Sequence, residues 1–198
     1  MAPRSIGPLP PPPADLDNQD LRILEHRATL SRIHRIDQDP AFWGRTGRNR
    51  FDAPAREFGV LYAATDEYGA FVETFGDSLS RTVTVNSLTA RGWSRVEPQR
   101  ILRLVDISGS GLAQMGADER LCSGEHDVAQ QWSFALWRHP ASVDGLYYRA
   151  RHDPSRMSVA LFDRVAPAVS IIRDGGLIDV RHQALLAAIL DTYQFSLL

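Results

Sequence analysis

The segment GVLYAATDEYGAFVE, residues 59–73, decides the fold, because it joins a strand directly to a helix. It opens with the β-forming residues 60–62, and two alanines follow them. Thr65 is the expected N-cap. The two acidic residues after it would lie in the first helical turn, where the helix dipole favours negative charge. We therefore expect a β-strand followed by an α-helix here.

Glu73 would lie about two turns into this helix, on the face that it shares with Gly69 and Ala70. Two residues with almost no side chain leave room for a ligand to approach the carboxylate. With Tyr62 at the end of the strand, the pattern suits a substrate that combines a sugar and a ring. On spacing alone, the more frequent alternative is that Tyr62 is a core residue and Glu73 a solvated one.

The composition is that of one soluble globular domain. The chain has 198 residues, of which 43% are hydrophobic and 23% charged, which is enough for one substantial core. The formal net charge is −2, so no overall electrostatic field points to nucleic acid or to a membrane. All 22 basic residues are arginine, a side chain that suits bidentate phosphate binding.

Cysteine usage and the N-terminal sequence favour a cytoplasmic protein. Cys122 is the only cysteine, so no intrachain disulfide can form, and a reducing compartment is the default. No apolar stretch is long enough to span a bilayer. The N-terminus lacks the basic and apolar regions of a secretory signal.

The hydrophobic pattern predicts a single α+β domain over 15–198, after a disordered, proline-rich leader at 1–14. Strands are expected at 30–36, 101–107, 143–151, 157–162 and 168–172. Helices are expected at 15–27, with Leu16, Leu21 and Leu24 as apolar positions, at 127–138, and from a cap at Asp179 to Tyr193, with Ala184, Leu185, Ala188 and Ile189 inward. Turns are expected near Gly92 and at 108–111, and Gly175 and Gly176 are expected to break the chain before the last helix.

Polar residues interrupt the expected strand at 30–36. Its alternation places Arg32 and His34 on the same side as the apolar residues Leu30 and Ile36. Such a local inconsistency is often found at a functional site. The alternative is an edge strand whose polar face lies in water.

The loop at 39–54 is rich in arginine. Four candidate ligand groups lie in it: Arg45, Arg48, Arg50 and Phe51. In a chain of net negative charge, this cluster favours a phosphate or carboxylate partner. Solvated loop arginines are the alternative.

The sequence lacks the motifs of several common classes of enzyme. The six histidines are scattered, without a second ligand at helical spacing, so a zinc site is not expected. No serine has the glycine spacing of a nucleophile elbow, and the dinucleotide fingerprint of hydride-transfer enzymes is missing. The lone cysteine has no evident activating partner. Arginines, tyrosines and one glutamate remain as candidates.

Four segments, taken in order, resemble the RES domain family: SRIHR (31–35), NRFDAP (49–54), GVLYAATDEYGAFVET (59–74) and DGLYYRARHDPSR (144–156). The resemblance covers the chain from about residue 30 to the C-terminal helix. It implies a fold related to ADP-ribosyltransferases, with a mixed sheet core and flanking helices. It also implies the activity of a toxin that destroys NAD+ and is paired with an Xre-type helix-turn-helix antitoxin.

The resemblance also implies the site. Arg32, Tyr62 and Glu73 match the family's catalytic arginine, tyrosine and glutamate. NAD+ would be the substrate, and no metal or cofactor is implied. The expected substrate-binding positions are Arg50, Phe51, His34 and Ala150, of which Ala150 stands where the family's serine follows a tyrosine–arginine pair.

The chemistry of NAD+ cleavage agrees with this assignment. Nicotinamide leaves without a general acid, so the enzyme mainly has to stabilise an oxocarbenium-like ribose, and one carboxylate can do so. Water or phosphate would accept the ADP-ribose. Transfer to a macromolecule, or a non-catalytic module that binds a nucleotide or the antitoxin, are the alternatives. No nucleic-acid or membrane partner is expected, and a homo-oligomer stays open.

Overall fold

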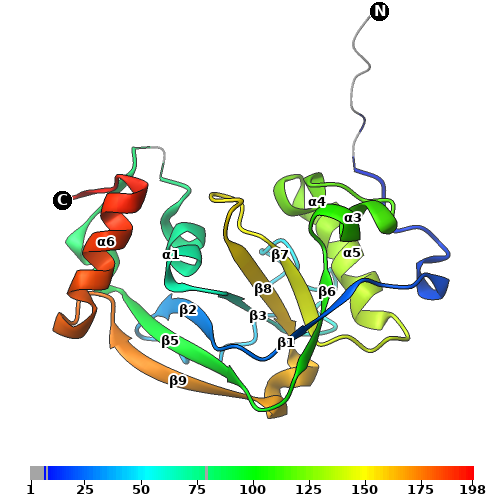
Figure 1. Ribbon diagram of the computed structural model, residues 1–198, viewed down its shortest axis with the longest axis horizontal. Helices are drawn as coiled ribbons and strands as arrows, with labels where there is room; N and C mark the ends of the chain where they lie inside the picture. Colours follow the sequence, from blue (N-terminus) through cyan, green and yellow to red (C-terminus); the bar gives the residue numbers. More distant parts are fainter. Residues whose placement is uncertain (1–6, 8, 79) are drawn as a thin grey trace, which may run out of the picture.

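One strongly curved mixed sheet of eight strands forms the centre of the protein (Figure 1). The computed structural model describes residues 7, 9–78 and 80–198, so residues 1–6 and 8 of the expected leader lie outside the described residues. The strand order is β1-β6-β7-β8-β3-β2-β5-β9, in which β6 and β7 run parallel and the other neighbours antiparallel. The strands are β1 (Ile23–His26), β2 (Leu30–Arg35), β3 (Val60–Ala64), β5 (Arg91–Pro98), β6 (Leu102–Asp106), β7 (Gly145–Arg149), β8 (Met157–Phe162) and β9 (Val169–Gly176). A separate parallel pair joins β4 (Thr82–Val83) to β10 (Ser196–Leu197).

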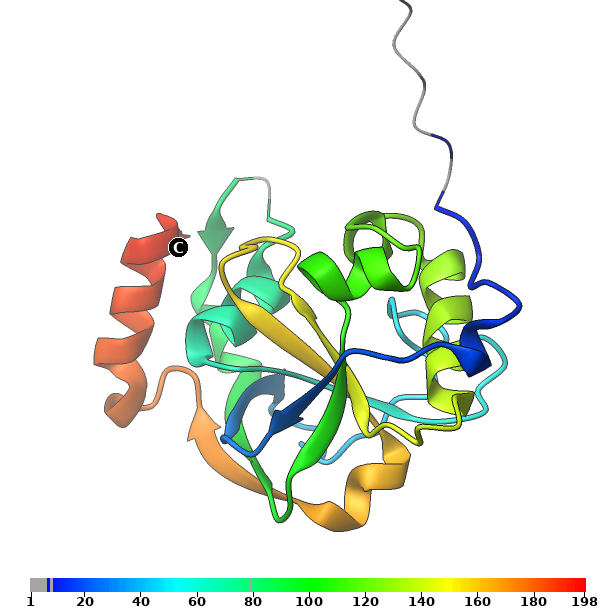
Figure 2. The same cartoon turned by 45° about the vertical axis from the view of Figure 1, so that its right-hand side comes forward.

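The helices form two groups on either side of the middle strands, as Figures 1 and 2 show from two directions. The first group consists of α3 (Gly109–Gln114), α4 (Arg120–Ser123) and α5 (His126–Arg138). The second consists of α1 (Glu67–Phe75), α2 (Val85–Thr89) and α6 (Gln183–Tyr193). Three 3-10 helices complete the described elements: η1 (Leu16–Asn18), η2 (Asp163–Ala168) and η3 (Val180–His182).

Three hydrophobic clusters hold these layers together. One cluster packs α5 against the sheet through buried residues such as Trp132 and Phe58. Another packs α1 and α6 together through Phe71 and Ile189. The third includes Leu61 and fills the space between the sheet and η2. Burial of this apolar surface supplies the main driving force for folding.

Several expectations from the sequence are confirmed. The chain is one α+β domain with a mixed sheet, and the strands expected at 30–36, 101–107 and 157–162 are β2, β6 and β8. The helix expected at 127–138 is α5. The alternative that 30–36 is an edge strand is wrong, because β2 lies between β3 and β5.

The helix expected at 15–27 is wrong. Only η1 is helical there, and the chain then enters β1, in which Ile23 lies opposite Val105 of β6. Pairing with a sheet edge satisfies the backbone of this segment and overrides its helical spacing of leucines. Leu16 is nevertheless buried, as an apolar position should be.

The turn expected near Gly92 is also wrong, whereas the chain break expected at Gly175 and Gly176 lies where β9 ends. Gly92 lies inside β5, opposite His34 of β2 and Gly176 of β9. A Cβ atom at Gly92 would lie 3.0 Å from the carbonyl oxygen of Gly175, so glycine here permits close approach of two strands. Gly175 has a φ of 91° and lies at an irregularity of the β5–β9 ladder.

Two helix starts differ from expectation. The turn expected at 108–111 is the beginning of α3, with Ser108 at its N-cap position. The last helix starts at Gln183, after η3, and Asp179 accepts a hydrogen bond from the amide of Gly176 rather than capping the helix. The buried residues of this helix are Leu186 and Ile189, whereas the expected inward residues Ala184 and Ala188 are exposed.

The second half of the expected leader packs against the domain. Leu9 is buried, and the carbonyl of Pro10 accepts a hydrogen bond from Trp132 Nε1 at 3.0 Å. A proline-rich segment loses little entropy when it is ordered, so few contacts suffice to hold it. Within the described ranges, no helix is long and apolar enough to cross a membrane.

Candidate active site

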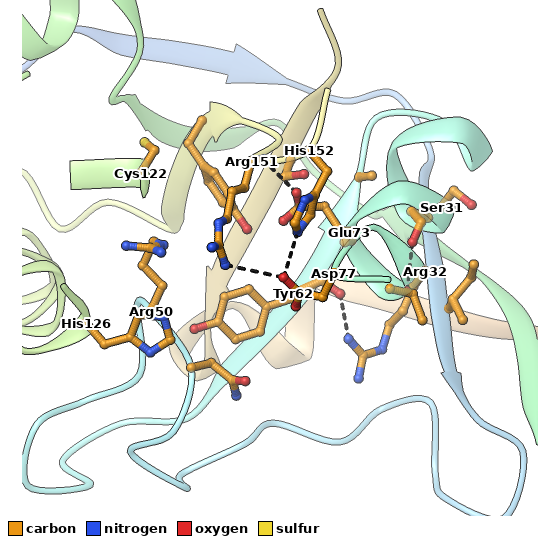
Figure 3. Close-up of a pocket in the computed structure, with 18 residues that line it drawn as sticks. Ser31, Arg32, Arg50, Tyr62, Glu73, Asp77, Cys122, His126, Arg151 and His152 are labelled. Atoms are coloured by element: carbon orange, nitrogen blue, oxygen red, sulfur yellow. Dashed lines mark hydrogen bonds and ion pairs between the residues drawn. The ribbon is translucent and has the colours of Figure 1, made fainter. Parts of the chain in front are cut away.

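A cavity of about 320 Å³ lies over the middle strands, between α1 and the α4–α5 segment. Arg32 of β2, Tyr62 of β3, Glu73 of α1 and Arg50 of the loop before β3 all line it (Figure 3). The structure therefore brings together the three expected catalytic residues and the expected second arginine. They come from four separate segments, so the cavity depends on the whole fold.

Glu73 is held in position by α1 and by the loop after β7. The N-cap of α1 is Asp66, whose carboxylate accepts a hydrogen bond from the amide of Gly69 at 2.8 Å, so the expected cap at Thr65 is wrong by one residue. Glu73 Oε1 accepts a hydrogen bond from the amide of Arg151 at 2.6 Å. Gly69 packs against Ala64 of β3, so its missing side chain serves helix packing rather than ligand access.

Burial and nearby hydrogen-bond donors have opposite effects on the pKa of Glu73. Burial raises the pKa of this carboxyl group, whereas the amide of Arg151 and the charges of His152 and Arg50 lower it. Burial is the largest of these effects, so the pKa lies above the ordinary value of a glutamate. Carboxylates with such shifts are frequent at catalytic sites.

The hydroxyl group of Tyr62 forms hydrogen bonds within the protein. The hydroxyl donates a hydrogen bond to Asp52 Oδ1 and accepts one from the amide of Phe51, both at 3.0 Å. Burial and the nearby Asp52 carboxylate raise the pKa of Tyr62 well above its usual value, so the hydroxyl stays protonated. The group that Tyr62 presents to a ligand in the cavity is therefore its ring.

Asp52 is a structurally important residue that the sequence analysis missed. Its side chain is 0% exposed and accepts hydrogen bonds from Thr46 Oγ1 and from the amides of Arg48 and Asn49, in addition to Tyr62. An aspartate whose carboxylate accepts hydrogen bonds from several backbone amides of a loop fixes the conformation of that loop. The only sequence signal was its place in the segment NRFDAP.

The two arginines are anchored differently. Arg32 Nη1 donates to the carbonyl of Tyr62 at 2.5 Å and Arg32 Nε to that of Pro40 at 3.1 Å, while burial lowers the pKa of Arg32 to about 10. Arg50 Nη1 donates to the carbonyl of Gly124 at 2.6 Å. Burial lowers the pKa of Arg50, and the nearby Glu73 opposes this shift. Figure 3 shows the two guanidinium groups on opposite sides of Tyr62.

Three expected substrate-binding residues lie outside the lining of this cavity. Phe51 is buried, and its ring packs edge to face on Tyr148 at a centroid distance of 4.9 Å. His34 is buried with Nδ1 3.2 Å from Ser94 Oγ, and burial lowers its pKa to about 4. Ala150 borders a neighbouring hollow instead.

The loop at 39–54 likewise contains an arginine that lines the cavity and others that do not. Of the arginines expected at 39–54, Arg50 lines the cavity. Arg45 forms an ion pair with Asp163 at 2.5 Å, and Arg48 is exposed. Arg50 is therefore placed where a ligand in the cavity could contact it, whereas the alternative of solvated loop arginines fits Arg45 and Arg48 better.

Charged residues at the rim were also missed by the sequence analysis. The carboxylate of Asp77 lies 3.5 Å from Arg151 Nη1 and 3.3 Å from His152 Nε2 (Figure 3). Both partners belong to the segment DGLYYRARHDPSR, whose pattern predicts a strand but does not indicate a role for either residue. The rim thus links the end of α1 to the loop after β7.

Nucleophilic catalysis by the lone cysteine is not favoured. Cys122 lines the cavity, but burial raises the pKa of its thiol to about 12. Within the described ranges, no group of three or more histidine, cysteine, aspartate or glutamate side chains is placed to hold a metal ion. The arrangement offers a fixed carboxylate, two arginines and an aromatic ring.

Comparisons with known proteins agree with this fold. The chain is 29% identical, over 123 residues, to the "Probable toxin y4kH" of Sinorhizobium fredii, covering 62% of this chain and 94% of that relative. A chain of the crystal structure of the M. tuberculosis MbcT–MbcA toxin–antitoxin complex superposes with a TM-score of 0.64 and 18% identity, covering 83% of this chain and 92% of the other. The model of the RES domain matches residues 25–185. Because this match spans most of the chain, the protein belongs to the RES domain family.

Proposed function

We propose that this protein is the toxin of a toxin–antitoxin system and that it degrades NAD+ by cleaving the bond between nicotinamide and ribose. Membership of the RES family, the likeness to a probable toxin and the fold shared with a chain of a toxin–antitoxin complex support the first part. One observation carries the second part: the half-buried carboxylate of Glu73 is fixed by the amide of Arg151 in a cavity that Arg50 and Tyr62 also line.

Cleavage needs stabilisation of a cation more than it needs acid catalysis. The positively charged nicotinamide leaves with the electron pair of the glycosidic bond, and positive charge develops on the ribose. The Glu73 carboxylate accepts a hydrogen bond from the ribose 2-hydroxyl, and this bond strengthens as the charge develops. Water then adds to the ribose and releases a proton to solvent, or phosphate adds in its place.

The other residues of the cavity bind and orient the substrate. Arg50 faces the cavity from the loop before β3 and binds the diphosphate, which matches the planar fork of a guanidinium. Arg32 contributes charge from the opposite side of Tyr62 and ties β2 to β3 through the Tyr62 carbonyl. The ring of Tyr62 stacks on the nicotinamide.

An antitoxin is the expected protein partner. The solved complex with a similar fold contains an antitoxin, which supports an antitoxin partner for this chain. This partner would cover the cavity lined by Glu73 and Arg50. We propose a small Xre-type helix-turn-helix protein encoded beside this chain. Co-expression should give a complex that lacks NAD+-consuming activity. A neighbouring gene product that neither co-purifies nor suppresses toxicity would contradict this.

Product analysis tests the reaction. Purified protein is incubated with NAD+, with and without inorganic phosphate, and the products are identified by mass spectrometry. The proposal expects nicotinamide together with free ADP-ribose or its 1″-phosphate. NAD+ that stays intact at high protein concentration would contradict cleavage. ADP-ribose attached to a protein or nucleic acid would instead show transfer to a macromolecule.

A further inference from the structure

One buried hydroxyl group in the cavity has no partner in the protein. Among the described residues, six buried side-chain polar atoms make no hydrogen bond: Gln19 Oε1, His34 Nε2, Trp93 Nε1, Trp137 Nε1, Arg156 Nε and Ser158 Oγ. Of these, Ser158 alone belongs to the lining of the cavity that holds Glu73. A buried polar atom without a partner costs free energy, so this hydroxyl calls for an explanation.

The register of the sheet places Ser158 on the floor of the cavity. Ser158 of β8 lies opposite Ala64 of β3 and opposite Tyr148 of β7. Residues directly opposite each other in antiparallel strands share a face, and both of these neighbours line the cavity as well. Ser158 is 1% exposed, so its hydroxyl lies at the bottom of the site and not at its rim.

The neighbouring hydroxyl group of Tyr148 does not form a hydrogen bond of ordinary geometry with Ser158. Burial raises the pKa of Tyr148 well above its usual value, and Ser158 is close enough to oppose this shift. Even so, no described atom lies within hydrogen-bonding distance and geometry of Ser158 Oγ. A ligand in the cavity could provide the missing partner, because the hydroxyl can both donate and accept.

The surroundings of Ser158 suit a neutral group. Its two cross-strand neighbours are the methyl group of Ala64 and the phenol ring of Tyr148. The arginines that line the cavity come from other segments: Arg32 from β2, and Arg50 and Arg151 from loops. A diphosphate needs such cations. A flat ring with one neutral amide needs apolar walls and a single hydrogen-bonding group, which is what this floor provides.

We propose that the hydroxyl of Ser158 binds the carboxamide of the nicotinamide ring and thereby fixes the leaving group over the sheet. This inference rests on the proposed cleavage of NAD+. It makes Ser158 a substrate-binding residue that acts on the ring, while Glu73 acts on the ribose. The ring of Tyr62 and the hydroxyl of Ser158 would then hold the same part of the substrate.

The substitution Ser158→Ala tests this role. It removes a hydroxyl that has no protein partner, so the melting temperature should stay the same or rise. The KM for NAD+ should rise by roughly 5- to 10-fold, the loss of one hydrogen bond, while kcat changes little. A lower melting temperature with an unchanged KM would show a structural hydroxyl and would overturn the proposal.

Ser94→Ala is the matched control. Ser94 is also 1% exposed and lies in the same sheet, on β5, but its hydroxyl contacts His34 Nδ1 at 3.2 Å and Ser94 does not line the cavity. This variant should lose stability and keep its KM. The two buried serines thus predict opposite results for stability and for substrate binding.

Binding of nicotinamide and of ADP-ribose, measured separately, distinguishes a contact to the ring from a contact to the rest of the substrate. Saturation-transfer NMR should show nicotinamide binding that is weakened by Ser158→Ala to the same extent as the KM, while ADP-ribose binding stays unchanged. Equal nicotinamide binding by both proteins, or weakened ADP-ribose binding instead, would overturn the assignment. Wild-type protein that binds nicotinamide through Ser158 but leaves NAD+ intact would contradict the proposed cleavage and not the binding site.

Discussion

At the residue scale, the structure separates arginines that the sequence could not separate. Arg45, Arg48 and Arg50 carry the same charge in one loop, yet of these three only Arg50 lines the cavity. The reason is the conformation that Asp52 gives to the loop, and this depends on a tyrosine from a different strand. Single-sequence patterns do not contain such long-range hydrogen bonds, and for the same reason they do not indicate that His34 and Phe51 lie outside the lining of the cavity.

Arg50→Lys tests the role of the guanidinium. An ammonium group cannot form the planar, two-point contact with a diphosphate, so the KM for NAD+ should rise on the order of 10-fold. The control is Arg48→Lys, a change at an exposed arginine two positions earlier in the same loop. Steady-state kinetics of both variants should show an effect at residue 50 alone. If Arg50→Lys had the same kinetics as the wild type and Arg48→Lys, Arg50 would not contact the substrate.

The raised pKa of Glu73 predicts the acid limb of the pH–rate profile. Burial raises this pKa above the ordinary glutamate value of 4.5, and the proposed mechanism requires the ionised form. As pH falls, kcat/KM should therefore decline at a pH above the one expected for an exposed glutamate. Circular dichroism at each pH would confirm that the protein stays folded. An acid limb at or below pH 4.5 would contradict a buried catalytic carboxylate.

At the element scale, the sequence was most informative where local pattern and tertiary pairing agree. The strand 60–64 and the helix after it were expected from β-forming residues, an N-terminal cap and acidic residues, and the structure has β3 and α1 there. The local sequence pattern gave the wrong prediction where pairing between strands determines the structure. Residues 23–26 became an edge strand, and Gly92 allows two strands to approach closely instead of forming a turn.

The N-cap of α1 gives a test of this element. Asp66 accepts a hydrogen bond from Gly69 N and forms an ion pair with Arg156 at 3.1 Å. Asp66→Ala should lower the free energy of unfolding by about 1 kcal/mol and the melting temperature by about 2–4 °C. Asp66→Asn keeps a capping oxygen and should lose less. Thermal unfolding that is the same for all three proteins would contradict the assigned cap.

At the scale of the whole molecule, the site exists because two helical groups stand on one curved sheet. The first group supplies the anchor for Arg50, through Gly124 after α4, and the second supplies Glu73 on α1. The middle strands between them supply Tyr62 and Ser158. Sequence motifs indicated most of these residues, but only the fold shows that they share one cavity and that the floor contains an unpaired hydroxyl.

Glu73→Gln tests the central proposal most directly, with turnover and melting temperature measured on one preparation. The change keeps the shape and removes the negative charge, so NAD+ turnover should fall by roughly 100-fold or more while NAD+ binding changes little. The folded-state pKa of Glu73 is raised, so its ionised form slightly destabilises the fold above that pKa. Near neutral pH the melting temperature of Glu73→Gln should therefore stay the same or rise slightly. Near-native NAD+ consumption by the folded variant would contradict the mechanism.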